Sequence, residues 1–194
     1  MNAFTEMLTQ QLAGTAISQI STKIGADPGT TSKAVQIAVP LLLAALARNS
    51  STPAGAESLN QALTNDHDGS LLDNLMGFLG NSESANGAGI LGHVLGPQRN
   101  DVETGLAQRT GLNPAATGQL LETVAPLVMA ALGKTRQEQG LDASSLSAYL
   151  GGQNQQAQST APGMMDMLGG LLDSNKDGSV LDDVSRMAGK FFGK

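Results

Sequence analysis

Apolar side chains recur every three or four residues along the first part of the chain, which is the spacing of one helical face. The stripe runs from Phe4 to Ile24. Gly25 is placed to end this helix in a left-handed turn. Asp27 and Pro28 then supply an N-cap and a first helical position, where the missing N–H of proline costs nothing. A second helix is therefore predicted to begin at Pro28.

The second helix is apolar on nearly all sides from Ile37 to Ala47, which predicts a buried, central position. Pro40 lies inside it and cannot donate a hydrogen bond to the carbonyl of Gln36, so a kink is expected. This apolar stretch is well short of the ~20 residues that a membrane-spanning helix needs. No membrane partner is predicted.

The same pattern returns 86 residues later. Gly25-Ala26-Asp27-Pro28 is matched by Gly111-Leu112-Asn113-Pro114, and the helix from Pro40 to Arg48 is matched by Pro126 to Lys134. Pro126 should kink its helix as Pro40 does. Such self-similarity is typical of an internal duplication.

The remaining patterns complete two similar halves. In the first half, further helices are predicted to begin at Pro53 and at Ser70. In the second half, helical segments are predicted over Ile90–Leu95, Asp101–Thr110 and Ala143–Leu150, and the kinked helix is predicted to end at Leu132–Lys134. No strand-like alternation is present. The predicted fold is all-α, an internal duplication of a four-helix unit, each built around a Pro-kinked apolar helix. The expected organisation is a first repeat over 1–80, a linker over 81–89, a second repeat over 90–150, a flexible linker over 151–163 and a C-terminal helix-loop-helix over 164–194.

These motifs resemble one bacterial family. The Gly-x-[Asp/Asn]-Pro caps, the Pro-Leu-[Leu/Val]-x-Ala-Ala-Leu helices and the Asp-Gly-Ser-x-Leu-Asp turns look like those of domain of unknown function 937. The likeness spans about Thr22 to Leu150. It implies a helical bacterial protein of intracellular type, and it carries over no catalytic residues because the family has none assigned.

Composition narrows the function classes further. Eleven Lys and Arg stand against seventeen Asp and Glu, a net charge of −6, and no basic run exists, so a nucleic-acid partner is not expected. The absence of cysteine excludes disulfides and thiolate chemistry. The N-terminal residues lack the basic and apolar regions of a secretory signal, which predicts a cytoplasmic location.

The clearest candidate for ligand chemistry lies between Asp173 and Asp183. Asp173, Asn175 and Asp177 occupy positions one, three and five of an EF-hand-like loop, Gly178 follows at six, and Ser179 offers its carbonyl at seven. Calcium prefers such oxygen ligands. Position twelve is Val184 instead of a bidentate Glu, so Asp182 or Asp183 would have to complete the site.

A structural interpretation of this loop stays open beside the calcium one. Gly178 can turn the chain, Ser179 can cap a helix, and the following acidic residues suit its first turn. The related turn from Asp66 to Asp73 has Thr64 at the first ligand position. There, a helix cap built on Ser70 is favoured over an ion site.

The two histidines carry no recognisable catalytic motif. His67 and His93 are far apart in sequence and lack the spacing of a zinc site or a triad. The Gly-x-Gly-x-x-Gly match at Gly87–Gly92 has no preceding strand, so a nucleotide site is not predicted. No enzyme activity and no small-molecule substrate are expected.

The favoured function is a non-catalytic interaction or assembly protein that self-associates as a homo-oligomer. Met164–Leu172 is rich in flexible apolar side chains, which suit an adaptable packing surface for a partner or for the protein body. The alternative is a calcium-binding module that acts through the Asp173 loop.

The calcium interpretation predicts weak binding. A dissociation constant of ~10⁻⁴–10⁻³ M is expected because the bidentate ligand at position twelve is missing. Asp177→Ala should abolish the heat of calcium binding in calorimetry, whereas Asp68→Ala in the first turn should leave it unchanged. If millimolar calcium produces no heat, the helix cap accounts for the whole motif.

Overall fold

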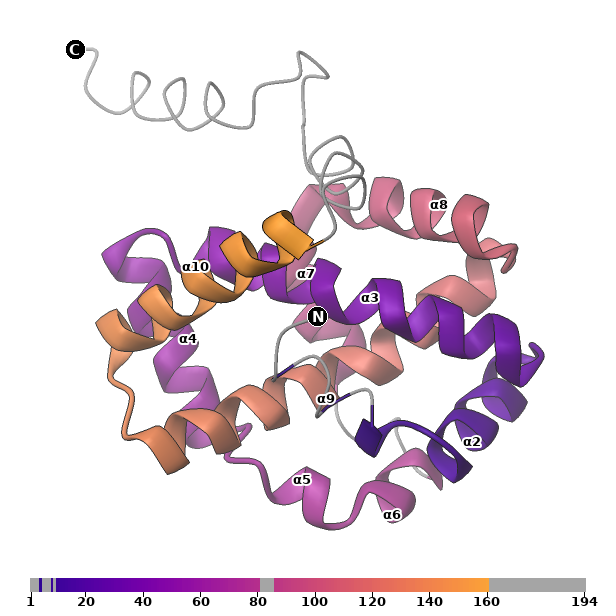
Figure 1. Ribbon diagram of the computed structural model, residues 1–194, viewed down its shortest axis with the longest axis horizontal. Helices are drawn as coiled ribbons and strands as arrows, with labels where there is room; N and C mark the ends of the chain where they lie inside the picture. The colour runs from indigo at the N-terminus through magenta and orange to yellow at the C-terminus, as the bar shows by residue number, and fades with distance from the viewer. Residues whose placement is uncertain (1–3, 5–7, 9, 81–85, 161–194) are drawn as a thin grey trace.

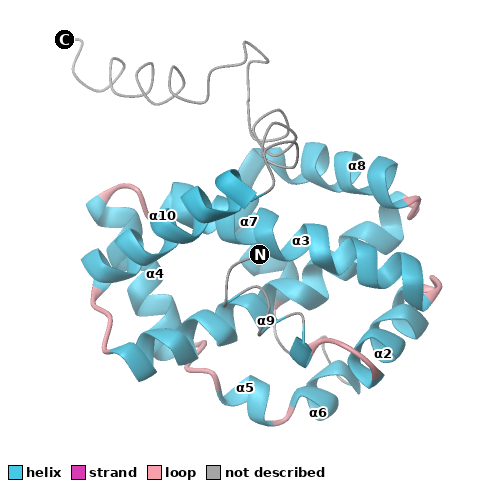
Figure 2. Ribbon diagram, in the orientation of Figure 1, coloured by secondary structure: helices cyan, strands magenta, loops and turns pink. Residues whose placement is uncertain are grey.

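The computed structural model describes residues 4, 8, 10–80 and 86–160, and within them every regular element is helical (Figure 2). This confirms the predicted all-α class. The elements are α2 (Thr15–Ile24), α3 (Pro28–Asn49), α4 (Pro53–Asn65), α5 (Ser70–Asp73), α6 (Leu75–Gly80), α7 (Gly87–Leu95), the short 3₁₀ helix η2 (Gly96–Gln98), α8 (Arg99–Thr110), α9 (Pro114–Gln139) and α10 (Ala143–Thr160).

The N-terminal apolar stripe is buried as predicted, but it does not form one helix. Phe4, Leu8 and Leu12 are at most 4% exposed. The chain turns at Gly14, whose φ of 64° is a conformation that glycine adopts without strain, and α2 begins at the next residue. The prediction of a single helix up to Ile24 was therefore wrong at Gly14.

The starts of the two long helices follow the predicted cap chemistry. The Asp27 carboxylate accepts a hydrogen bond from the Thr30 N–H at 2.9 Å. The Asn113 side-chain oxygen accepts one from the Ala116 N–H at 2.8 Å. Each satisfies an N–H that has no partner within its helix. Both prolines, Pro40 and Pro126, lie inside their helices.

Helix α9 is the centre of the fold, whereas the sequence predicted one central apolar helix in each half. It packs against α2, α3, α4, α5, α7 and α8 (Figure 1). Its buried residues run without interruption from Thr123 to Gly133, so every side of this stretch is covered. An all-round apolar helix removes water-accessible surface only when neighbours enclose it, which is why six helices surround α9.

Both long helices have the length and apolarity of a membrane span. Mean hydropathy over the most apolar window is 1.4 in α3 and 1.3 in α9. Most of each window, 61% and 83% respectively, is buried inside the protein. The apolar surface of these helices is thus largely used in packing against the rest of the chain.

The helix predicted from Ser70 is divided into α5 and α6. Asn74 separates them with a non-helical backbone, φ −128° and ψ 48°. Its side-chain oxygen then accepts a hydrogen bond from the Gly77 N–H at 3.3 Å. Asparagine competes well for backbone groups in this way, which favours helix ends over helix interiors.

The second half contains more helix than predicted. α7 already begins at Gly87, inside the predicted linker, and α9 continues past Lys134 to Gln139. α10 reaches Thr160, so the predicted flexible linker over 151–163 was wrong for its first ten residues. Leu146 and Leu150 are fully buried, and α10 packs on α3 and α4. This burial outweighs the weak helix propensity of the glycine pair at 151 and 152.

The start of α10 is held by Asp142. Its carboxylate accepts hydrogen bonds from the Ser145 N–H and from the Ser144 hydroxyl, both at 2.8 Å. The hydrogen bond from the Ser145 backbone, followed by the one from Ser144, lowers the pKa of Asp142 to about 2.

Two glycines allow neighbouring backbones to approach α9 closely. A Cβ at Gly133 would collide with the carbonyl oxygen of His67, and a Cβ at Gly87 would collide with the carbonyl oxygen of Glu122. Pro126 has no N–H to donate to this same Glu122 carbonyl. The N-terminal end of α7, where the helix dipole is positive, lies against it.

Arg99 links the helices that meet near Glu122. Its guanidinium bonds Glu103 at 2.7 Å and Glu122 at 2.6 Å, and it donates to the Ala88 carbonyl at 3.4 Å. These contacts join α7, α8 and α9.

Gly133→Ala should destabilise the protein by about 1–3 kcal/mol, because the added methyl group forces the His67 turn away from α9. The free energy of unfolding from urea denaturation measures this change. Gly92→Ala is the matched control, since Gly92 lies within α7 and a Cβ there would meet nothing within 4 Å. Alanine at Gly92 should be neutral or stabilising by up to ~1 kcal/mol. Equal effects of the two substitutions would contradict the close approach.

Candidate functional site

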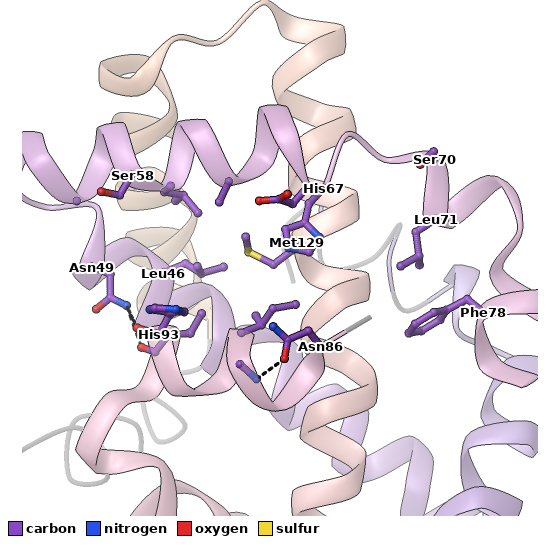
Figure 3. Close-up of a pocket in the computed structure, with 17 residues that line it drawn as sticks. Leu46, Asn49, Ser58, His67, Ser70, Leu71, Phe78, Asn86, His93 and Met129 are labelled. Carbon is purple, nitrogen blue, oxygen red and sulfur yellow. Dashed lines mark hydrogen bonds between the residues drawn. The ribbon is translucent and has the colours of Figure 1, made fainter. Parts of the chain in front are cut away.

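The main candidate site is a groove with a volume of about 1080 Å³ (Figure 3). Its walls come from the end of α3, from α4 and the turn after it, from α5, α6 and α7, and from one residue of α9. The lining residues are Leu46, Asn49, Gly55, Ser58, Leu59, Ala62, Asp66, His67, Ser70, Leu71, Phe78, Asn86, Gly89, Ile90, His93, Val94 and Met129. The groove therefore brings together the only two histidines of the chain.

His67 enters the groove from the turn between α4 and α5. The turn is anchored on α9, because the His67 carbonyl lies against Gly133. The side chain is half-buried beside Met129 in Figure 3. Burial lowers the pKa of His67 below its ordinary value, and the nearby charge of Asp66 opposes this effect. The neutral imidazole is thus favoured.

His93 lies on α7 and is exposed at the opposite wall. The Asn49 side-chain amide, at the end of α3, donates to the carbonyls of His93 at 3.1 Å and Val94 at 2.9 Å. At the other end of α7, Asn86 adopts a left-handed backbone with φ 48° and accepts a hydrogen bond from the Gly89 N–H at 3.3 Å. Both ends of the helix that carries His93 are therefore held by asparagine side chains.

The rest of the groove is mainly apolar. Met129 is 5% exposed, whereas Ala62, Leu71, Phe78 and Ile90 are partly exposed. In Figure 3, Leu71 and Phe78 lie toward one end, and Asn49, Ser58 and His93 lie toward the other. The groove thus has an apolar end and a more polar end, which is typical of a site that orients an amphipathic ligand.

The polar groups of the groove do not form a recognisable catalytic or metal centre. Among the described residues, no cluster of three or more His, Cys, Asp or Glu could hold a metal ion. Within the same part of the chain, the imidazoles make no hydrogen bond to a hydroxyl or carboxylate, as a nucleophile–base pair would require.

The residues of the predicted calcium loop, Asp173, Asn175, Asp177, Ser179, Asp182 and Asp183, lie outside the described residues. Met164–Leu172, Phe191 and Phe192 also lie outside the described residues.

The related turn before α5 is described, and its cap differs from the prediction. Gly69, with φ 100°, is the N-cap, and Ser70 is already the first helical residue. The Asp68 carboxylate accepts a hydrogen bond from the Ser70 N–H at 3.0 Å. Gly69 packs closely against Lys134 and Ala130, where an added Cβ would crowd Lys134.

Several groove residues carried no signal in the sequence. Asn49, Phe78 and Met129 come from α3, α6 and α9, and Asn86 is the N-cap residue before α7. Their apolar or capping character is evident locally, but their common location depends on how the helices pack. Gly87–Gly92 also reaches the groove, as the start of α7.

Fold and site together define an all-helical protein with a partly apolar, preformed groove. The chain belongs to the family described as bacterial protein of unknown function, DUF937, whose sequence model matches residues 6–135 and 137–192. This confirms the resemblance seen in the caps and apolar helices. No curated protein and no solved structure matches the chain.

The environment of His67 predicts a specific pH dependence. The pKa of His67 is lowered in the folded protein from its ordinary value of 6.5. As the pH falls below 6.5, His67 therefore takes up a proton more readily in the unfolded chain than in the folded protein. The stability that neutral His67 contributes is therefore complete above pH 6.5 and is lost below it.

Proton NMR titration of the imidazole Cε1–H resonances tests this directly, with His93→Gln used to leave His67 as the single histidine. The His67 midpoint should lie below 6.5. His67→Gln should also weaken the pH dependence of unfolding in this range. A midpoint at or above 6.5 would contradict the burial of this side chain.

Proposed function

We propose that this protein is a non-catalytic interaction protein that self-associates through the groove. The occupant is the Met-rich segment Met164–Leu172 of a second copy of the chain. The observation that carries the proposal is the groove itself, which is preformed, mainly apolar and open to solvent along Ala62, Leu71, Phe78 and Ile90.

The size and chemistry of the groove support a segment of helix or chain as the occupant. At about 1080 Å³ it is slightly larger than the ~300–1,000 Å³ range of small-molecule sites. Methionine and leucine side chains adapt well to irregular apolar surfaces. Most soluble oligomers are homo-oligomers, so a second copy is the simplest source of such a segment.

Binding rather than catalysis is supported by the separation of the titratable groups. His67 and His93 lie on different walls of the groove (Figure 3). A net charge of −6 disfavours nucleic acid as a partner. We also propose a cytoplasmic location, with which the largely buried apolar windows of α3 and α9 are compatible.

We also propose that the two halves are copies of one helical unit, with α2, α3 and α4 corresponding to α8, α9 and α10. The pattern of packing supports this, because it is preserved when the two sets are exchanged. α2 packs on α3 as α8 packs on α9. α2 also packs on α9 as α8 packs on α3, and α4 packs on α9 as α10 packs on α3. α3 also packs on α9, and α4 packs on α10. Each of these contacts joins a helix to its own counterpart, so it would lie on the rotation axis that relates the two copies.

The proposed duplication is tested by superposing the two halves of an experimental structure. An experimental structure in which no single rotation places α3 and α4 on α9 and α10 would contradict it.

Self-association predicts a homo-oligomer in sedimentation velocity at concentrations on the order of tens of micromolar, where specific oligomers persist. Ser58→Arg should shift the protein to monomer, because Ser58 is exposed at the mouth of the groove and a bulky charge there obstructs entry. A peptide spanning residues 162–173 should compete in the same way.

Thr64→Arg is the matched control for charge and size. Thr64 is also exposed on α4 but does not line the groove. This variant should retain the wild-type mass. A wild-type protein that is strictly monomeric, or equal effects of the two arginines, would overturn the proposed mode of assembly.

A further inference from the structure

Equivalent faces of α3 and α9 differ in how well they are covered. On α9, the stripe formed by Thr123, Pro126, Ala130 and Gly133 is entirely buried. The matching stripe on α3 consists of Ile37, Pro40, Ala44 and Ala47. Of these, only Ala44 is buried, and the other three are partly exposed.

The cover on the α9 stripe comes from the turn before α5 and from α5 itself. The His67 carbonyl lies against Gly133, and Gly69 lies against Ala130 and Lys134. α5 packs on α9, and α6 continues onto α2. The side chain of Lys134 also approaches Asp73 of α5, with Nζ 3.7 Å from Oδ1.

The sequence of the turn before α5 and of α5 itself has a similar counterpart near the C-terminus. Asp68-Gly69-Ser70-Leu71-Leu72-Asp73 is echoed by Asp177-Gly178-Ser179-Val180-Leu181-Asp182. The first follows α4, and the second follows α10, its proposed counterpart. The second echo lies outside the described residues.

We infer that the C-terminal segment from Asp177 to Phe192 docks in cis on the partly exposed stripe of α3, as the turn and α5 dock on α9. This inference rests on the proposed duplication and assigns the second echo a packing role and a place on α3. Residues 161–176 span at most about 53–58 Å when extended, and they tether the segment to α10, which itself packs on α3.

The correspondence specifies the arrangement of the docked segment. Gly178 lies against Ala44 and Arg48, the counterparts of Ala130 and Lys134. Asp182 lies on the side of Arg48, as Asp73 does for Lys134. The remainder of the segment continues onto α8, which packs on α3 as α2 packs on α9.

One residue makes the second docking weaker than the first. Gly133 admits the His67 carbonyl because it has no side chain. Its counterpart is Ala47, whose methyl group holds the backbone of Lys176 farther from the helix. The contact therefore buries less surface, and the docking is expected to be weaker than that of α5 on α9.

Hydrogen exchange followed by mass spectrometry on the full chain tests this inference. Amides of residues 179–192 should exchange at least ~10-fold more slowly than in a free peptide of the same sequence. Ala47→Arg should remove this protection and leave that of residues 70–80 unchanged. Gln36→Arg, at an exposed position on α3 outside the stripe, should preserve it.

Protein concentration separates docking in cis from docking between copies. Protection that stays constant on dilution supports the inference, and protection that falls on dilution assigns the stripe to a second copy and overturns it. Free exchange of residues 179–192 in the wild type also overturns it. Self-association through the groove is read independently from the mass of the Ser58→Arg variant, so the two proposals fail separately.

Discussion

The whole structure depends on enclosing one helix that is apolar on every side. α9 has no polar face between Thr123 and Gly133, so its burial requires neighbours in all directions. α3 lies against it along the centre, and α2, α4, α5, α7 and α8 supply the remaining cover. Pro126 adds a second requirement, because it leaves the Glu122 carbonyl without its usual helical donor. The start of α7 packs directly against that carbonyl, and only Gly87 is small enough to permit the contact.

The groove is a consequence of how this enclosure is achieved. The turn that carries His67 is held on α9 by the absence of a side chain at Gly133. The helix that carries His93 is held at the end of α3 by the amide of Asn49. The space between the two attachments is the groove, lined mainly by residues of α4, α5, α6 and α7 together with Leu46, Asn49 and Met129.

Sequence reasoning succeeded where the determining interaction is local. Caps at Asp27 and Asn113 and the left-handed turns at Gly25 and Gly111 involve residues within one turn of each other, so composition and spacing identify them. It failed at Gly14 and Asn74, where one residue breaks a helix although the apolar spacing continues past it, and at the glycine pair within α10, where packing outweighs weak helix propensity. The groove could not be predicted because its residues meet only through tertiary contacts; His67 and His93 belong to different elements, and neither has a partner nearby in sequence.

Under the proposed duplication, a repeated helix need not have a repeated environment. α9 carries Gly133 where α3 carries Ala47, and only the position without a side chain could accept a carbonyl as close as that of His67. The half with glycine is closed tightly by the turn before α5. The half with alanine keeps Ile37, Pro40 and Ala47 partly exposed. The α9 stripe is already fully buried, so a further contact there would remove no apolar surface from water. The α3 stripe still has apolar surface to bury, and under the proposed duplication it is therefore the face of the core on which an additional segment gains most by docking.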